Sequence, residues 1–134
     1  MAFSTHFEIK LWDILTNKCI RTLYDAESNS NLRPTCLELS KVGNLMVGIN
    51  NGRIKMFNLK APYECLIDFK ATENKVTCIR TLLISGKHLT TSLKDNKIKL
   101  WSNLDDLKIN FEKIFVCQVP VNVDGDKKKL KRSL

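Results

Sequence analysis

Long apolar runs are missing from this chain of 134 residues. No stretch of about 18 consecutive apolar residues occurs, which is the length that a membrane-spanning helix needs. The N-terminal residues 1–8 lack a basic region followed by an apolar core, so they do not resemble a secretory signal. The sequence therefore predicts neither a transmembrane helix nor a signal peptide.

The residue patterns of common active sites and metal sites are also missing. Gly86-Lys87 is followed by His88 instead of Ser or Thr, and Thr81 stands where a phosphate loop needs its first glycine. No Cys-x-x-Cys pair occurs, neither histidine lies at zinc-ligand spacing from a cysteine, and no Ser-His-Asp order with a nucleophile elbow is present. We expect a chain that is not an enzyme, with no catalytic, cofactor-binding or metal-ligating residue and no cofactor. These patterns leave the partner-binding residues unidentified.

What the chain does contain is a short signature that returns at a nearly fixed interval. Its copies are Ile-Lys-Leu-Trp-Asp at 9–13, Ile-Lys-Met-Phe-Asn at 54–58 and Ile-Lys-Leu-Trp-Ser at 98–102. Successive copies begin 45 and 44 residues apart. A period in the forties with a Trp-Asp-like ending is typical of β-propeller repeats, in which each unit forms one four-stranded blade.

The segments around each signature have the pattern of short strands joined by turns. Gly43-Asn44 and Gly86-Lys87 each separate two apolar runs, and Asn51-Gly52 and Asp95-Asn96 each precede a signature. Both of the latter dipeptides tolerate positive φ, and Asn-Gly is a strong hairpin signal. We expect strands at 44–49, 53–58, 88–93 and 97–101, with outer strands at 18–23, 64–69 and 112–118.

The signature endings Trp12-Asp13, Phe57-Asn58 and Trp101-Ser102, the Asp95 turn and the repeat period resemble the WD40 family. The resemblance covers roughly residues 3–118. It implies an all-β fold, namely an incomplete WD40 β-propeller with two near-complete four-stranded antiparallel blades and part of a third. We accordingly expect a partial WD40 repeat region at 1–118 and a basic, disordered tail at 119–134.

One family feature is not matched. The usual Gly-His before the innermost strand is missing, and Asn74-Lys75 stands near that place in the last unit. The resemblance therefore does not carry over the family's buried His–Asp hydrogen-bond network, and the blades are expected to be less rigid.

The chain is short for a propeller. At about 44 residues per blade it holds about three units, whereas propellers typically close with about four to eight blades. Terminal units of a repeat array leave apolar faces that need covering. We expect further blades to be needed for closure. A truncated gene product is the favoured explanation, and a piece of a longer protein or one part of an assembled ring are the alternatives.

A narrower resemblance rests on Ser4-Thr5, the run 9–14 and Lys18-Cys-Ile-Arg-Thr-Leu23. These segments are similar to one blade of the C-terminal WD40 domain in kinesin-like motors related to the chromokinesins. The resemblance implies a fragment of a microtubule motor tail that contacts microtubules, tubulin or cargo. It also implies a cytoplasmic and cytoskeletal location.

The cysteines follow the repeat. Cys36 and Cys78 hold equivalent places on expected innermost strands, while Cys19 and Cys65 fall on expected outer strands and Cys117 is the fifth. Free cysteine packs as a small apolar residue, so we expect buried, reduced thiols. An odd count without a signal peptide favours a reducing compartment, consistent with the cytoplasm.

Two residue types recur beside each other in the signatures. The aromatic position is occupied by Trp12, Phe57 and Trp101. We expect it to pack between neighbouring blades, with an aromatic binding surface as the alternative. The lysine position is occupied by Lys10, Lys55 and Lys99. We expect the stems to cover apolar surface while the ammonium groups reach water, with a stripe that meets an acidic partner as the alternative.

The positive charge is concentrated at the C-terminus. Five of the 22 basic residues lie at 127–132, which leaves 17 basic and 14 acidic residues over 1–126. The tail is expected to be a solvated terminus. The alternatives are attraction to nucleic acid, anionic lipid or the microtubule surface, and a nuclear-import patch.

The favoured function is a non-catalytic protein–protein interaction scaffold of WD40 type, in which loops on the blade rims meet other proteins. The expected rim loops are 25–34, 60–62, 70–75 and 102–108, and the first is the favoured contact because it is the longest. Polyanion binding through the basic tail, to nucleic acid or an anionic membrane, is the competing hypothesis, although nucleic acid is the less favoured partner. A fragment without activity of its own is the third alternative.

Overall fold

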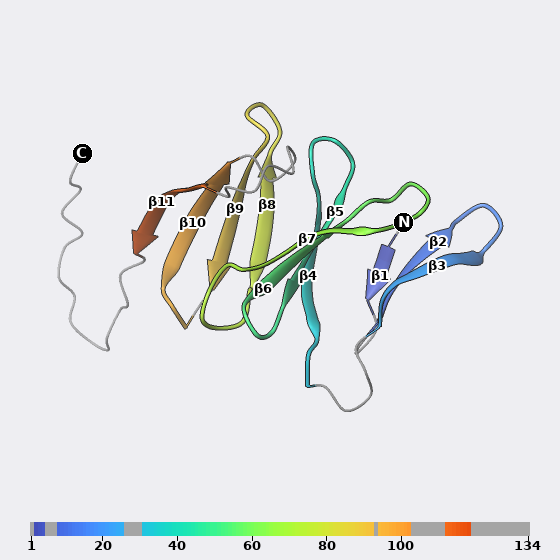
Figure 1. Cartoon of the computed structure of the whole chain (residues 1–134), viewed down its shortest axis with the longest axis horizontal. Helices are drawn as coiled ribbons and strands as arrows, with labels where there is room; N and C mark the ends of the chain where they lie inside the picture. The colour runs from blue at the N-terminus through green and yellow to red at the C-terminus, as the bar shows by residue number, and fades with distance from the viewer. Residues whose placement is uncertain (1, 5–7, 26–30, 93, 103–111, 119–134) are drawn as a thin grey trace, which may run out of the picture.

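The computed structural model of the chain describes residues 2–4, 8–25, 31–92, 94–102 and 112–118, and all regular structure within these ranges is β-strand (Figure 1). The first sheet contains β1 (Ala2–Ser4), β2 (Glu8–Asp13) and β3 (Lys18–Asp25). The second contains β4 (Pro34–Leu39), β5 (Leu45–Ile49), β6 (Arg53–Phe57) and β7 (Cys65–Lys70). The third contains β8 (Cys78–Leu82), β9 (Lys87–Ser92), β10 (Lys97–Ser102) and β11 (Glu112–Gln118).

Each sheet is an antiparallel meander in which neighbouring strands follow one another along the chain. The strands predicted from the turn dipeptides are all present, with ends shifted by at most two residues. The predicted outer strand 112–118 is β11, and its pairing with β10 runs from Ser102↔Glu112 to Lys97↔Gln118. This pairing completes a four-stranded blade, so the chain has two full blades and three strands of another.

A β-bulge marks the same place in every sheet. The pairing of the third strand of each unit with its outer strand shifts register between Leu11 and Trp12, between Met56 and Phe57, and between Leu100 and Trp101. A bulge bends the strand and increases its twist. Its recurrence just before the aromatic residue confirms that the three signatures occupy equivalent positions.

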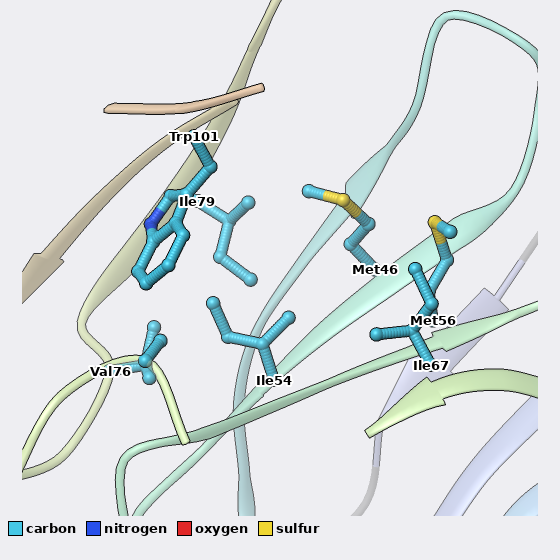
Figure 2. Close-up of a cluster of buried hydrophobic side chains, with 8 residues drawn as sticks. Met46, Ile54, Met56, Ile67, Val76, Ile79 and Trp101 are labelled. Carbon is cyan, nitrogen blue, oxygen red and sulfur yellow. The ribbon is translucent and has the colours of Figure 1, made fainter. Parts of the chain in front are cut away.

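Between the second and third sheets lies the larger apolar core (Figure 2). It consists of Met46, Ile54, Met56, Ile67, Ala71, Val76, Ile79 and Trp101. A second cluster lies between the first and second sheets and consists of Ile9, Leu45, Val47, Ile49 and Phe57. Because successive side chains of a strand point to opposite faces, β5 contributes to both clusters, and all of its residues are buried.

The signature aromatic packs between sheets in two of the three copies. Phe57 is buried in the smaller cluster, and Trp101 is buried in the larger one, where its ring meets the edge of Phe69 at 5.0 Å and 70°. Trp12 is only half-buried, on the face of the first sheet opposite to Leu11, which the described residues do not cover with another sheet. The packing prediction is therefore confirmed for Phe57 and Trp101 but not for Trp12.

The signature aromatic and its diagonal neighbour on the adjacent strand are matched in polarity. The Trp101 indole Nε1 donates to Thr90 Oγ1 at 2.9 Å inside the core. In the second sheet Val47 stands at the place of Thr90, as the pairs Lys55↔Val47 and Lys99↔Thr90 show. Phe57 has no N–H to satisfy, so an apolar neighbour suffices there.

Candidate functional site

The connections of the sheets alternate between two edges, because the strands are antiparallel. One edge carries the β3–β4, β5–β6, β7–β8 and β9–β10 connections, and we call it the polar edge. The other carries the β2–β3, β4–β5, β6–β7 and β8–β9 connections, and we call it the apolar edge. The hairpins β4–β5 and β8–β9 stand at the top of Figure 1 and the polar edge at the bottom. Of the predicted rim loops, the described parts of 25–34 and 70–75 lie at the polar edge, and 60–62 lies at the apolar edge. The predicted loop 102–108 is described only at Ser102, and residues 26–30 of the first loop also lie outside the described residues.

A shallow open pocket of about 540 Å³ lies at the polar edge. Its lining is Asn31, Arg33, Pro34, Thr35, Asn50 and Lys75. Three different connections meet there, from β3–β4, β5–β6 and β7–β8. The groups that line the pocket are amides, a hydroxyl and two cationic side chains, which favours a partner rich in carbonyl or carboxylate oxygens.

Asn50 holds the β3–β4 connection in place. Its side-chain Nδ2 donates to Asn31 O at 2.6 Å, and its Oδ1 accepts from Arg33 N at 2.9 Å. Its backbone N also donates to Arg33 O at 3.0 Å. The Asn50 side chain therefore satisfies the carbonyl of Asn31 and the N–H of Arg33, which lie in a segment outside the strands. Arg33 is presented at the pocket by this fixed backbone.

Thr35 links the pocket to the third sheet. Its Oγ1 donates to Val76 O at 2.5 Å, across the junction between the second sheet and the β7–β8 connection. Lys75, the next residue back, is exposed beside this contact. The pocket is thus held on both sides by hydrogen bonds to main-chain atoms.

Asp95 joins the β9–β10 turn to the β7–β8 connection at the same edge. Its carboxylate accepts hydrogen bonds from the Thr72 hydroxyl and from the Asn74 side-chain amide. The hydrogen bond from Thr72, together with the one from Asn74, lowers the pKa of Asp95 below its ordinary value. Asp95 was predicted as a turn residue, and it does sit in the β9–β10 turn, where Asn96 has a φ of 49°.

A different hydrogen-bond network therefore stands near the place of the missing Gly-His. Asn74, which stands near that place in sequence, supplies an amide donor to Asp95, and Thr72 supplies a second donor. Sequence reasoning noted Asn74 but missed Thr72. The available signal was a hydroxyl two residues before an asparagine in the connection that precedes an innermost strand.

Gly52 brings the β5–β6 turn against the β7–β8 connection. Its φ is +86°, and its carbonyl accepts from Ala71 N at 2.9 Å and Thr72 N at 3.1 Å. A Cβ at this position would lie 1.9 Å from Thr72 O. The Asn51-Gly52 turn predicted from sequence is thus required for close approach as well as for its backbone conformation.

The recurring lysines do not form an open cationic stripe. Lys10 Nζ lies 2.6 Å from Glu8 Oε2, and Lys55 Nζ lies 3.2 Å from Asp68 Oδ2. Lys99 Nζ donates to Ala71 O. Each ammonium group therefore contacts an oxygen of its own or the neighbouring sheet, while the Lys10 and Lys55 side chains remain 33% and 25% exposed. These contacts also disfavour a dedicated lysine stripe for an acidic partner.

The cysteines occupy the expected strands but are less buried than predicted. Cys36 and Cys78 are half-buried on β4 and β8, whereas Cys19 and Cys65 are exposed on the outer strands β3 and β7. All four are free thiols. The prediction of buried thiols is wrong for Cys19 and Cys65, because an outer strand has a neighbour on one side only. Burial raises the pKa of the Cys36 thiol.

Neither a metal cluster nor a membrane-spanning helix is found in the described ranges. There, no group of three or more His, Cys, Asp and Glu side chains is placed to hold a metal ion. No helix there is long and apolar enough to cross a bilayer.

Three stacked antiparallel sheets with this repeat period define an incomplete β-propeller. Comparison with known proteins shows that this fold is similar to that of WD40 propellers. The chain is 28% identical over 101 residues to U3 small nucleolar RNA-associated protein 12 of Saccharomyces cerevisiae, a match that covers 75% of this chain and 10% of that protein. It is 28% identical over 94 residues to the Target of rapamycin complex subunit wat1 of Schizosaccharomyces pombe, covering 69% of this chain and 28% of that protein.

A solved structure shows the same fold. A chain in the crystal structure of the mitotic checkpoint complex superimposes with a TM-score of 0.68 at 16% identity, covering 87% of this chain and 33% of that chain. The two sequence relatives are WD40 proteins and the structural neighbour is a WD40 propeller, which confirms the predicted fold class. This chain spans a third or less of each of these proteins. No family model matches the sequence.

Proposed function

We propose that this chain is a non-catalytic protein–protein interaction scaffold of WD40 type and that its polar edge contacts the partner. The observation that carries the proposal is the pocket of about 540 Å³, in which Arg33 and Lys75 stand on connections held by Asn50 and Thr35. Sheets that fix loops in space are suited to recognition. One relative supports this role, since it is named as a subunit of a complex, while the other is named as RNA-associated.

Charge reversal at the pocket tests this proposal. A tagged chain is used to isolate binding proteins from cells of its source, and each binding protein is then purified and titrated against variants. We expect the double variant Arg33→Glu, Lys75→Glu to weaken binding by at least about tenfold, because a cationic lining is replaced by an anionic one. The matched control is Arg21→Glu, which reverses an exposed charge within β3, outside the connections of both edges. Equal affinities for all three chains would exclude the polar edge as the contact.

The finer prediction is a fragment of a kinesin-like motor tail that contacts microtubules, tubulin or cargo. The relatives found do not support it, and it stays a prediction together with the cytoskeletal location. The cytoplasmic location is likewise a proposal. Sedimentation of the purified chain with microtubules at low and moderate salt tests the motor version. Absence of the chain from the microtubule pellet at both salt concentrations would remove it.

Polyanion binding through the basic tail stays an alternative. Residues 127–132 lie outside the described residues, so their sequence alone carries the idea. Deletion of these six residues separates the two hypotheses. Loss of all binding on deletion, with the Arg33→Glu, Lys75→Glu variant still active, would replace the scaffold proposal by this one.

A further inference from the structure

The edge opposite the polar pocket gathers nearly all of the exposed apolar side chains. Eight large apolar residues of the described chain are more than a third exposed, and seven of them lie at the apolar edge. These seven are Ile14, Leu15, Leu39, Val42, Leu82, Leu83 and Ile84. The most exposed are Ile84 at 98% and Leu15 at 91%. Scattered exposed apolar residues are ordinary, but a collection on one edge marks an interaction surface.

A groove runs into this edge between the first and second sheets. It is an open cavity of about 650 Å³. Leu11 and Leu45, both buried, form part of its lining, and the exposed residues Ile14 and Leu39 also line it. Leu59, from the β6–β7 connection, lines it as well. The groove is therefore concave, apolar and large enough to take side chains.

Hydrogen bonds fix the part of the edge next to the groove. The Glu38 carboxylate accepts from Arg80 Nη1 at 3.1 Å and from Thr81 N at 2.8 Å, and Thr81 Oγ1 donates to Leu39 O at 2.8 Å. These bonds join the end of β4 to the end of β8. The surface is consequently preformed, and the one carboxylate in the groove lining is already paired.

Stacking of further blades does not explain why the part of this surface in the second sheet is exposed. Leu39 and Val42 belong to the second sheet, which already has a sheet against each face. They remain 54% and 63% exposed, because they lie at the sheet edge and not on its faces. The exposure of these two residues therefore does not result from the open ends of the array.

Among the described residues of the apolar edge, basic side chains outnumber acidic ones. Lys41 and Lys60 are exposed in their connections, and Lys18 (exposed) and Lys87 (half-buried) begin the strands that follow two other connections. Lys41 Nζ donates to Ile84 O at 3.5 Å, which places the β4–β5 and β8–β9 connections close to one another. On the acidic side, Glu64 is exposed, while the Asp13 carboxylate accepts from Leu15 N at 2.9 Å and Thr16 N at 3.4 Å within its own turn.

We infer that the apolar edge docks an amphipathic, acidic segment of a partner protein. Apolar side chains of the segment enter the groove over Leu11 and Leu45, and its carboxylates lie against the lysines of the connections. This assignment deepens the proposed scaffold role by adding a second contact surface and its partner chemistry. A planar membrane touches only protruding tips such as Leu15 and Ile84, whereas the groove lining extends to buried residues, which favours a polypeptide with side chains.

The test uses a fluorescein-labelled helical peptide of about 16 residues, with leucines at i, i+3, i+4 and i+7 spacing and glutamates on the flanks. Fluorescence anisotropy measures its affinity for the full chain. We expect binding that weakens between about 50 and 300 mM NaCl, because the lysines contribute. The double variant Leu39→Ser, Ile84→Ser should bind at least about tenfold more weakly. The matched control is Ile20→Ser, which removes an exposed apolar side chain of β3 that does not line the groove; Ile20 is 50% exposed, close to the 54% of Leu39.

Charge supplies the second arm of the test. The variant Lys41→Glu, Lys87→Glu should weaken binding of the glutamate peptide and strengthen binding of a peptide in which lysines replace the glutamates. Unfolding transitions followed by circular dichroism identify any variant that has lost its fold. Replacement of exposed side chains leaves the core intact, so we expect unchanged transitions.

Three outcomes would overturn the assignment. They are no binding of the glutamate peptide, equal loss of affinity in Ile20→Ser, and binding to phosphatidylcholine–phosphatidylserine vesicles that depends on Leu39 and Ile84 while the peptide does not bind. The last result would assign the edge to a membrane surface. Failure here leaves the polar edge untouched, since the Arg33→Glu, Lys75→Glu variant reports on that surface separately.

Discussion

The side-chain amide of Asn74 donates a hydrogen bond to the carboxylate of Asp95, and this contact joins the β7–β8 connection to the β9–β10 turn. The Thr72 hydroxyl donates to the same carboxylate. Two segments that are about 20 residues apart in sequence are thereby held together at the polar edge. Asn74 stands near the place of the missing Gly-His, and the network there consists of an amide, a hydroxyl and a carboxylate.

Removal of the Asp95 carboxylate should destabilise the third sheet. For Asp95→Ala we expect a loss of about 1–2 kcal/mol in the free energy of unfolding, because two donors lose their acceptor. The double variant Thr72→Val, Asn74→Ala should lose a similar amount, and the triple variant little more than either, since all three changes remove one network. Urea denaturation measures these values. Simple addition of the losses would contradict the network.

Acid should weaken the same contact. Because hydrogen bonds lower the pKa of Asp95 in the folded chain, its contribution is fully present above the unfolded value of about 3.9 and is lost as the pH falls through the folded value. The difference in melting temperature between the wild type and Asp95→Asn should therefore shrink as the pH is lowered below about 4. Asp13 also has a lowered pKa, mainly from the backbone N–H of Leu15, so the comparison is best repeated in an Asp13→Asn background. A constant difference across this range would contradict the prediction.

Two glycines with the same φ should differ sharply in their tolerance of alanine. Gly43 and Gly52 both have a φ of +86°, but a Cβ at Gly43 meets nothing within 4 Å, whereas one at Gly52 lies 1.9 Å from Thr72 O. Gly43→Ala should cost about 1–2 kcal/mol from backbone strain alone. Gly52→Ala should cost about 3 kcal/mol or more, because the β7–β8 connection must also move. Equal costs in denaturation experiments would show that the turn and the connection are not in contact.

The indole hydrogen bond in the core can be isolated by a double-mutant cycle. Trp101→Phe removes the donor and Thr90→Val removes the acceptor, in imitation of the Phe57 and Val47 pair in the second sheet. We expect a coupling free energy of about 1 kcal/mol between the two changes, from urea denaturation. The double variant should be more stable than Trp101→Phe alone, since a buried hydroxyl no longer lacks its donor. A coupling near zero would contradict the hydrogen bond.

Alkylation should distinguish the cysteines by their exposure. Cys19 is exposed and should react with iodoacetamide under native conditions at least about tenfold faster than Cys36, which is half-buried and has a raised pKa, because the thiolate is the reactive form. Mass spectrometry of peptides after timed quenching gives each rate. Similar rates in the native chain would contradict the described burial, and similar rates in urea serve as the control.

Much of the fold could be predicted from local sequence. The strand positions follow from turn dipeptides such as Asn51-Gly52 and Asp95-Asn96, which restrict φ within two or three residues, and from the repeat period. Local preferences of this kind act between neighbours in the chain, so they can be recognised without coordinates. The bulge before Trp12, Phe57 and Trp101 was not predicted from the sequence, although in the structure it recurs with the signature.

The candidate sites depended on contacts between distant segments. Nothing in the order of residues states that Thr72 reaches Asp95, that Asn50 holds Asn31 and Arg33, or that Lys55 pairs with Asp68. The exposure of Cys65 and the unequal burial of Trp12 and Trp101 likewise depend on which face has a neighbouring sheet.

The sequence by itself therefore determined the repeat, its strands and its class of fold, because alternation and turn chemistry are local. Only the tertiary structure decided that one edge is polar and hydrogen-bonded while the other is apolar and carries a groove. The physical reason is that each edge is assembled from connections of different sheets. Their side chains come together only after the sheets have packed.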